Sequence, residues 1–187
     1  MGMQGKSIRK VLLLSLMVVS FAAGAQDPDS GQEESHPCES GNEFHHFDFW
    51  VGEWDVHDAA GTLVGQNRIS RREQGCVLLE EWQGAKGFTG MSINYYDPST
   101  GKWKQSWVSA GAYLIEVEGG LNEEGAMALI GRIYYFGPGR EAKFRGLWTP
   151  LDDGRVRQFF EQSDDAGETW QPWFEGFYSR QTKTADQ

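Results

Sequence analysis

The chain has 187 residues, a formal net charge of −10 at pH 7, 24 glycines and 13% aromatic residues. An acidic chain of this kind repels nucleic acid and anionic membrane surfaces, so we expect neither as a partner. The many aromatic residues and glycines favour short strands joined by tight turns over helices, in a single domain of ordinary size.

Residues 1–25 have the pattern of a secretory signal peptide. Lys6, Arg9 and Lys10 precede an apolar run over 11–23, and small residues follow it. Without this segment the formal charge becomes −13, because 14 basic residues then face 27 acidic ones. No later stretch has the roughly 18 apolar residues that a membrane helix needs. We therefore expect an exported protein, periplasmic or secreted, that is not inserted into a membrane once the signal is removed.

The segment over 26–42 is polar and acidic, which is typical of a flexible leader. It contains Cys38, and the other cysteine of the chain is Cys76. Two cysteines in a chain bound for an oxidising compartment predict one disulfide, with a reactive thiol or a metal site as the alternative. The folded domain is expected over 43–182, followed by a short tail over 183–187.

Turn-forming residues divide this domain into ten apolar-rich runs. Because no helix separates the runs, they predict an all-β antiparallel meander. Ten strands leave two unpaired edges unless the sheet closes, so we expect a ten-stranded barrel with a short helical turn before its first strand. Such a barrel is wide enough to hold a pocket. The predicted strands cover residues 53–58, 62–72, 76–83, 88–96, 103–109, 113–118, 126–136, 141–149, 155–162 and 170–181.

One hairpin predicts which side chains share a face. The turn in "YYDPSTGKW" places Asn94 opposite Gln105. Lys104 lies on the other face, and a lysine is costly inside a barrel, so we expect the Asn94 face to point inward. Amides among indole rings suit a pocket that orients a ligand, although an ordinary barrel wall is the alternative. The predicted ligand-binding residues of this hairpin are Asn94, Tyr96, Trp103, Gln105 and Trp107.

A second hairpin adds two candidates. In "PLDDGRV", a two-residue turn at Asp153-Gly154 pairs Leu151 with Val156. This pairing places Arg145 and Gln158 on the inner face as further ligand-binding residues. Arg145 is then expected to bind a ligand carboxylate through both guanidinium nitrogens.

The stretch "FDFWVGEWDV" contains a Gly-x-Trp pattern at Gly52 and Trp54. It resembles the corresponding pattern of the calycins, the lipocalin and fatty-acid-binding barrels and their relatives. The resemblance implies that Trp54 closes one end of the barrel and that Arg180, on the last strand, packs across its ring. We expect the aromatic residues before Gly52 to plug the same end and Asp48 to cap the short turn there.

Longer strings are more specific. The stretches "FDFWVGEWDV", "GCVLLEEW", "SINYYDPSTGKWKQSWV" and "WTPLDDGRVRQFFEQSDDAGETW" resemble a family of exported bacterial proteins of unknown function called DUF1579. The resemblance covers residues 44 to 181 and implies a calycin-like, lipocalin-like or nitrobindin-like β-barrel. It implies no particular reaction or ligand.

Metal and cofactor chemistry lack support in the sequence. The histidines lie at or before the first predicted strand without the spacing of metal ligands, at His36, His45, His46 and His57. The haem-binding nitrobindins, which are similar ten-stranded barrels, use a histidine on a late strand, and this chain has none there. No serine or cysteine nucleophile motif occurs. We therefore predict no metal, no cofactor and no catalytic residue.

Three functions compete. The first is a barrel that binds an unknown small, partly apolar molecule in its interior. The second is an enzyme that uses the same cavity for acid–base or isomerase-type chemistry, with Glu161 or Glu118 as the base. The third is a scaffold that binds another protein through exposed apolar residues. The sequence does not indicate an oligomeric state.

Overall fold

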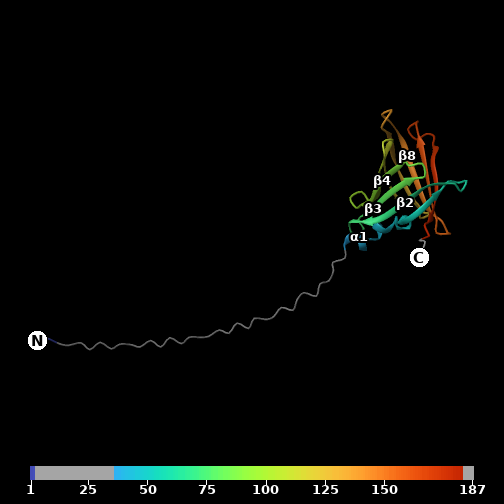
Figure 1. Cartoon of the computed structure of the whole chain (residues 1–187). Helices are drawn as coiled ribbons and strands as arrows, with labels where there is room; N and C mark the ends of the chain where they lie inside the picture. Colours follow the sequence, from blue (N-terminus) through green and yellow to red (C-terminus); the bar gives the residue numbers. More distant parts are fainter. Residues whose placement is uncertain (3–35, 183–187) are drawn as a thin grey trace. The chain divides into compact units, whose positions relative to one another are not determined.

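The computed structural model describes residues 1–2 and 36–182, and within them ten antiparallel strands form a closed barrel (Figure 1). Each strand pairs with its neighbours in the sequence, and β1 closes the barrel against β10. The predicted all-β meander is confirmed and is consistent with a calycin-like fold. The strands are β1 Gly52–His57, β2 Leu63–Arg72, β3 Val77–Gly84, β4 Thr89–Asp97, β5 Lys102–Ser109, β6 Tyr113–Leu121, β7 Met127–Tyr135, β8 Arg140–Pro150, β9 Val156–Ser163 and β10 Gln171–Arg180.

The helical elements of the described residues are short. They are α1 Pro37–Ser40, η1 Asn42–His45, η2 Asp48–Trp50 and η3 Glu73–Gly75. The first three confirm the expected helical turn before the first strand, and none of the helices described is long and apolar enough to span a membrane.

The predicted disulfide joins Cys38 in α1 to Cys76, which follows η3. It ties part of the expected leader, the short helix α1, to the barrel. The predicted signal peptide over 1–25 and the tail over 183–187 fall almost wholly outside the described residues.

The strands alternate between an inner and an outer face, as their side-chain period of two requires. In β5 the buried side chains are Trp103, Gln105, Trp107 and Ser109, and the side chains between them lie on the outer face. The pairing of Asn94 with Gln105 is the predicted one. The Asn94 face therefore points into the barrel.

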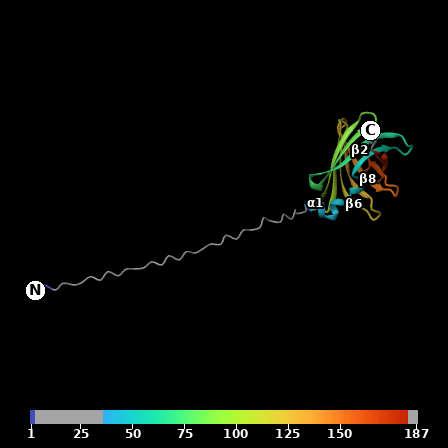
Figure 2. The ribbon, with the colours of Figure 1, turned by 60° about the horizontal axis from the view of Figure 1, so that its bottom comes forward.

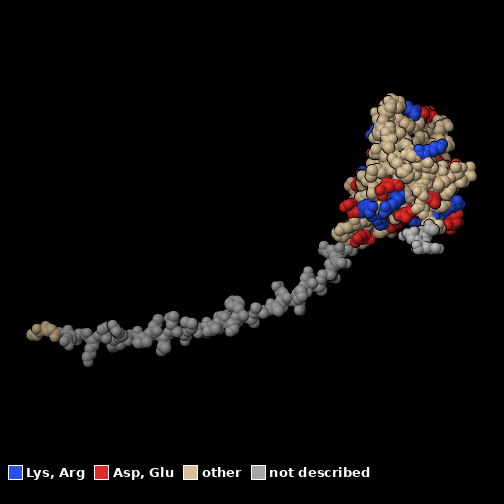
Figure 3. Space-filling model, viewed as in Figure 1, with Lys and Arg blue, Asp and Glu red and all other residues tan. Residues whose placement is uncertain are grey.

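The two ends of the barrel differ. The segment that contains α1, η1 and η2 lies at one end, which we call the closed end, and the β3–β4, β5–β6 and β7–β8 turns lie at the other (Figures 1 and 2). On the face in Figure 3, acidic and basic side chains lie together near α1, and the half farther from α1 carries fewer charges.

Aromatic side chains fill the closed end. The ring of Phe47 stacks on Trp50 with centroids 4.9 Å apart, and its edge meets Trp103 and Trp148. Both Phe47 and Trp50 are fully buried. The indole Nε1 of Trp54 donates a hydrogen bond to the carbonyl of Trp50 at 2.9 Å. These contacts place the aromatic plug where the sequence pattern predicted it.

Arg180 seals this end at the seam of the barrel, where it pairs with Trp54 across β1 and β10. Its guanidinium lies 4.0 Å from the centre of the Trp54 ring, and its Nη1 donates to the carbonyl of Val51 at 2.7 Å. Gly52 has a φ of +152°, and a Cβ at this position would overlap the guanidinium. The glycine therefore leaves the space that the Trp54–Arg180 contact occupies.

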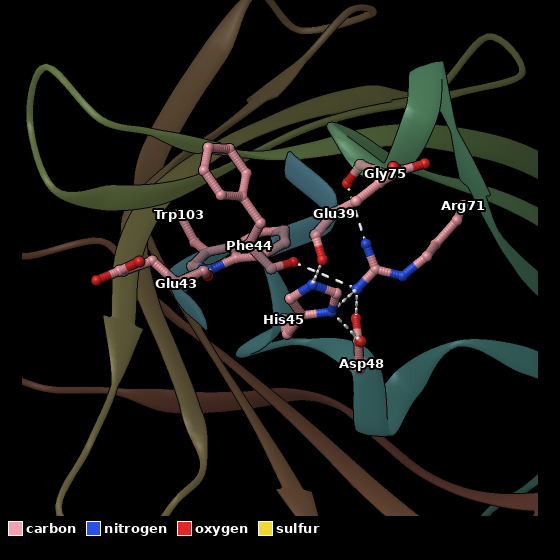
Figure 4. A network of polar contacts seen from close by, with 8 residues as sticks. All are labelled: Glu39, Glu43, Phe44, His45, Asp48, Arg71, Gly75 and Trp103. Atoms are coloured by element: carbon pink, nitrogen blue, oxygen red, sulfur yellow. Dashed lines mark hydrogen bonds and ion pairs between the residues drawn. The ribbon is translucent and has the colours of Figure 1, made fainter. Parts of the chain in front are cut away.

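A polar network fastens η1 and η2 to β2 (Figure 4). The guanidinium of Arg71 donates to the carbonyls of Gly75 and Phe44 at 3.0 and 3.3 Å and forms an ion pair with Asp48. His45 Nδ1 lies 2.8 Å from the Asp48 carboxylate. The expectation that Asp48 caps a turn is wrong, because η2 has no side-chain cap and Arg71 attracts the carboxylate instead.

The predicted register of the second hairpin is also wrong. The turn holds three residues, Asp152 to Gly154, so Val156 pairs with Pro150 and not with Leu151. A slip of one residue turns every side chain of a strand to the other face. Arg145 therefore lies outside, where it binds Glu161 at 2.6 Å and its guanidinium lies 4.3 Å from the centre of the Trp170 ring.

The contact between Arg180 and Trp54 makes a prediction about stability. Replacing Arg180 by methionine (Arg180→Met) keeps an apolar chain over the ring and removes the charge and the hydrogen bond to Val51. We expect the free energy of unfolding to fall by about 1–2 kcal/mol in a urea titration. Arg132→Met is the control, because its ion pair with Glu141 is exposed and contributes less than about 1 kcal/mol. Equal effects of the two substitutions would contradict the proposed seal.

Candidate functional site

A cavity of about 220 Å³ lies inside the barrel, toward the end opposite the plug. We call it the inner cavity. Its buried residues lie deep in the barrel. Its half-buried residues, such as Trp82, Phe88 and Tyr113, lie near the turns of the end opposite the closed end, which we call the open end. Aromatic rings therefore form the walls and polar groups lie deeper. The lining residues are Glu80, Trp82, Phe88, Gln105, Trp107, Tyr113, Gln158, Phe160, Trp173, Phe174 and Tyr178.

Four of the lining rings lie directly against glycines. A Cβ on Gly90 would overlap the ring of Trp107, and a Cβ on Gly65 would overlap the ring of Trp82. Phe160 and Phe174 lie in the same way against Gly146 and Gly176. Because a glycine has no side chain, each ring can lie flat against the backbone. This arrangement leaves space in the centre of a barrel that large aromatic residues would otherwise fill.

A chain of buried polar groups crosses the interior below the rings. Gln105 Nε2 donates to Asn94 Oδ1 at 2.8 Å, and Asn94 Nδ2 donates to Ser92 Oγ at 2.8 Å. Ser92 Oγ in turn donates to the Glu80 carboxyl at 2.6 Å. These bonds connect β3, β4 and β5 and satisfy groups that would be costly to bury alone.

The chain continues from Glu80 to the other side of the barrel. Asn67 Nδ2 donates to Glu80 Oε1 at 2.7 Å and to the Tyr178 hydroxyl at 3.2 Å. The Tyr178 hydroxyl donates a short hydrogen bond to Gln158 Oε1. The carboxyl of Glu80 therefore lies at the centre of a network that spans the barrel.

Glu80 is the one lining residue with a carboxyl group, and it is only 3% exposed. Burial raises its pKa to about 7, and the hydrogen bonds from Ser92 and Asn67 oppose this shift in part. Burial and the nearby Glu80 also raise the pKa values of Tyr113 and Tyr178. Glu80 is thus the group of the cavity that can change its charge near neutral pH.

The residues predicted to bind a ligand separate into three groups. Gln105, Trp107 and Gln158 line the inner cavity, and Asn94 lies behind them and holds Gln105. Tyr96 and Trp103 belong to the closed end, where Trp103 Nε1 donates to the carbonyl of Glu43 at 3.0 Å (Figure 4). Arg145, outside the barrel, does not reach the cavity.

The sequence did not single out Glu80, and other carboxylates were predicted as the base. Glu161 binds Arg145 and Glu118 binds Lys102 on the outer face, so neither is the base of a cavity reaction. The register supplies the signal that was missed, because Glu80 pairs with Ser92 and shares its inward face. The sequence of the turn between β3 and β4 did not predict which residues of these two strands pair.

The outer wall has larger hollows, but several of the charged side chains that line them are already paired. One of about 800 Å³ is lined by Lys104 and Arg132 among others. Lys104 binds Asp97 at 2.7 Å, and Arg132 lies 3.4 Å from Glu141. The inner cavity is the better candidate, because it combines apolar walls with a buried carboxyl group that has no ion-pair partner.

Comparisons with known proteins add no assignment: no family model and no curated protein matches the chain. Among the described residues, no three His, Cys, Asp or Glu side chains lie close enough together to hold a metal ion.

The packing of Trp107 on Gly90 is testable. We expect Gly90→Ala to push the indole into the inner cavity and to lower the free energy of unfolding by about 1–3 kcal/mol. Gly120→Ala, in strand β6, is the matched control, because a Cβ there meets nothing within 4 Å. The control should change stability by less than about 1 kcal/mol, and in the favourable direction. Urea titration checks both variants, and a harmless Gly90→Ala would disprove the packing argument.

The pKa of Glu80 predicts how stability depends on pH. The pKa is higher in the folded protein, about 7, than the ordinary value of 4.5, so the folded state holds its proton more tightly. The contribution of Glu80 to the free energy of unfolding is favourable at low pH. It falls by about 3 kcal/mol as pH rises from 4.5 to about 7 and is constant above that.

The measurement is the free energy of unfolding of the native protein minus that of Glu80→Gln, at a series of pH values. The subtraction removes the titration of carboxylates that both proteins share, such as Asp97 and Asp165, whose pKa values are lowered by hydrogen bonds. A difference that does not change over this range would show that Glu80 is not buried as described.

Proposed function

We propose that the protein binds a small, partly apolar molecule in the inner cavity. The observation that carries this proposal is a cavity of about 220 Å³ with aromatic walls and a buried carboxyl at the centre of a polar network. Aromatic walls gain free energy when they cover an apolar ligand, and a few fixed polar groups orient it. Gln105 Oε1 has no protein partner among the described residues and is available to a ligand, and the ring of Trp107 lines the same cavity.

The compartment is part of the same proposal. The Cys38–Cys76 disulfide fits an oxidising compartment outside the cytosol. Together with the predicted signal peptide, it supports an exported binding protein. Membership in the DUF1579 family is likewise proposed, on the sequence strings quoted above and the ten-stranded barrel.

A second candidate function is acid–base catalysis in the same cavity. Glu80 favours it, because a carboxyl group with a pKa of about 7 can accept and release a proton at neutral pH. Catalysis would convert the bound molecule, whereas a binding protein returns it unchanged. Mass spectrometry of a bound molecule before and after incubation separates these two functions.

The third alternative, a protein-binding scaffold, rests on the outer wall. Met91 pairs with Val108 across β4 and β5, both are 50% exposed, and Ile93 lies beside them. These apolar side chains form a small patch but do not indicate a particular partner, so we place this function after ligand binding.

The proposed binding is tested with three small aromatic probes of similar size: 2-phenylethylamine, 2-phenylethanol and 3-phenylpropionate. We expect at least one of them to shift the indole N–H signal of Trp107 in a saturable way in NMR spectra of the ¹⁵N-labelled protein. The indole N–H signal of Trp54 is the internal control and should not move, because this N–H donates a hydrogen bond to the carbonyl of Trp50 in the closed end.

Gly90→Ala should weaken probe binding, because the displaced Trp107 fills the cavity, while Gly120→Ala should not. If no probe shifts Trp107, or if Trp54 responds equally, the inner cavity is not a binding site and the proposed function is wrong.

A further inference from the structure

The inner cavity holds a carboxyl group that has no positively charged partner. Its lining contains no lysine, arginine or histidine. The ion pairs found among the described residues are all formed by acidic residues other than Glu80. A buried carboxylate without a counter-ion is costly, and a positive ligand would remove that cost.

The groups around Glu80 stabilise a negative charge on its carboxyl group. Asn67 and Ser92 each donate a hydrogen bond, one to each carboxyl oxygen. Asn94 donates to Ser92 Oγ, so the Ser92 hydroxyl proton is directed toward Glu80. Two neutral donors do not fully compensate burial, which is why the pKa stays near 7 and the ionised form still gains from a cation.

The walls of the cavity also favour a cation. Eight of the eleven lining residues are aromatic, and the faces of aromatic rings attract positive charge. Tyr113 and Trp173 meet edge to face with centroids 5.2 Å apart, and Phe88 stacks on Tyr113, so these rings form a corner near the open end. Rings around a carboxylate are the arrangement that recognises organic ammonium groups.

The other titratable and polar groups of the cavity also favour a positively charged ligand. Tyr113 and Tyr178 are the titratable groups that face Glu80, and both stay neutral because burial raises their pKa values. The unpartnered Gln105 Oε1 can accept a hydrogen bond from an ammonium N–H. The negative charge of the whole chain attracts cations and repels anions.

We infer that the ligand of the inner cavity is a small organic cation, an amine or ammonium compound with an apolar body, whose positive nitrogen pairs with Glu80. This inference rests on the proposed function and specifies its ligand class. The apolar body lies against Trp107, Phe160 and the rings at the open end, and the ammonium group lies at the polar network.

The test compares the three probes in the whole protein by calorimetry near pH 8. We expect 2-phenylethylamine to bind about tenfold or more tightly than 2-phenylethanol, and 3-phenylpropionate to bind most weakly. Glu80→Gln should abolish the preference for the amine while the neutral alcohol still binds. Glu81→Gln is the matched control, because the adjacent Glu81 is exposed on the outer face and its removal changes the net charge equally.

A pH series on the native protein keeps the test decisive if Glu80→Gln does not fold. The affinity for the amine should rise about tenfold between about pH 5.5 and 8.5, as Glu80 ionises, while that for the alcohol should change little.

The outcomes separate the two proposals. If the alcohol or the propionate binds as tightly as the amine, the cavity binds ligands and the cation inference is wrong. The same conclusion follows if Glu81→Gln lowers the preference as much as Glu80→Gln. If none of the probes binds, the proposed function itself has failed.

Discussion

The closure of the sheet between β1 and β10 is the constraint on which the rest of the structure depends. Once the barrel is closed, each strand has one face that must point inward, whatever its side chains are. Most inward positions hold aromatic or aliphatic residues, but Glu80, Asn67, Asn94, Gln105 and Gln158 lie there as well. They are tolerated because they bond to one another in a connected network.

The two ends of the barrel use aromatic residues in opposite ways. At the closed end, Phe47 and Trp50 stack tightly, and Arg180 covers Trp54, so the rings fill space. Toward the open end, rings such as Trp107 lie against glycines and leave the inner cavity between them. The same residue type thus builds the seal and the cavity, and glycines make room at both ends, Gly52 at the seal and Gly90 beside Trp107.

Much of the fold follows from local sequence signals. Turn residues predict the ends of the strands to within three residues, and the Asp97 to Gly101 turn sets the register that points Asn94 and Gln105 inward. The prediction failed at the turn before Val156, where one additional loop residue reverses the face of Arg145. It also failed to find Glu80, because alternation alone does not say which of two adjacent glutamates faces inward.

The sequence by itself determined the all-β meander, the disulfide pair, the aromatic plug and the Trp54–Arg180 contact, because these depend on composition, turn chemistry and one short motif. Only the tertiary structure decided which polar residues meet inside, since Asn67 on β2 and Tyr178 on β10 come from strands far apart in the chain. It also decided that the carboxyl of Glu80 is buried among rings without a positive partner, because burial and pairing depend on all ten strands together.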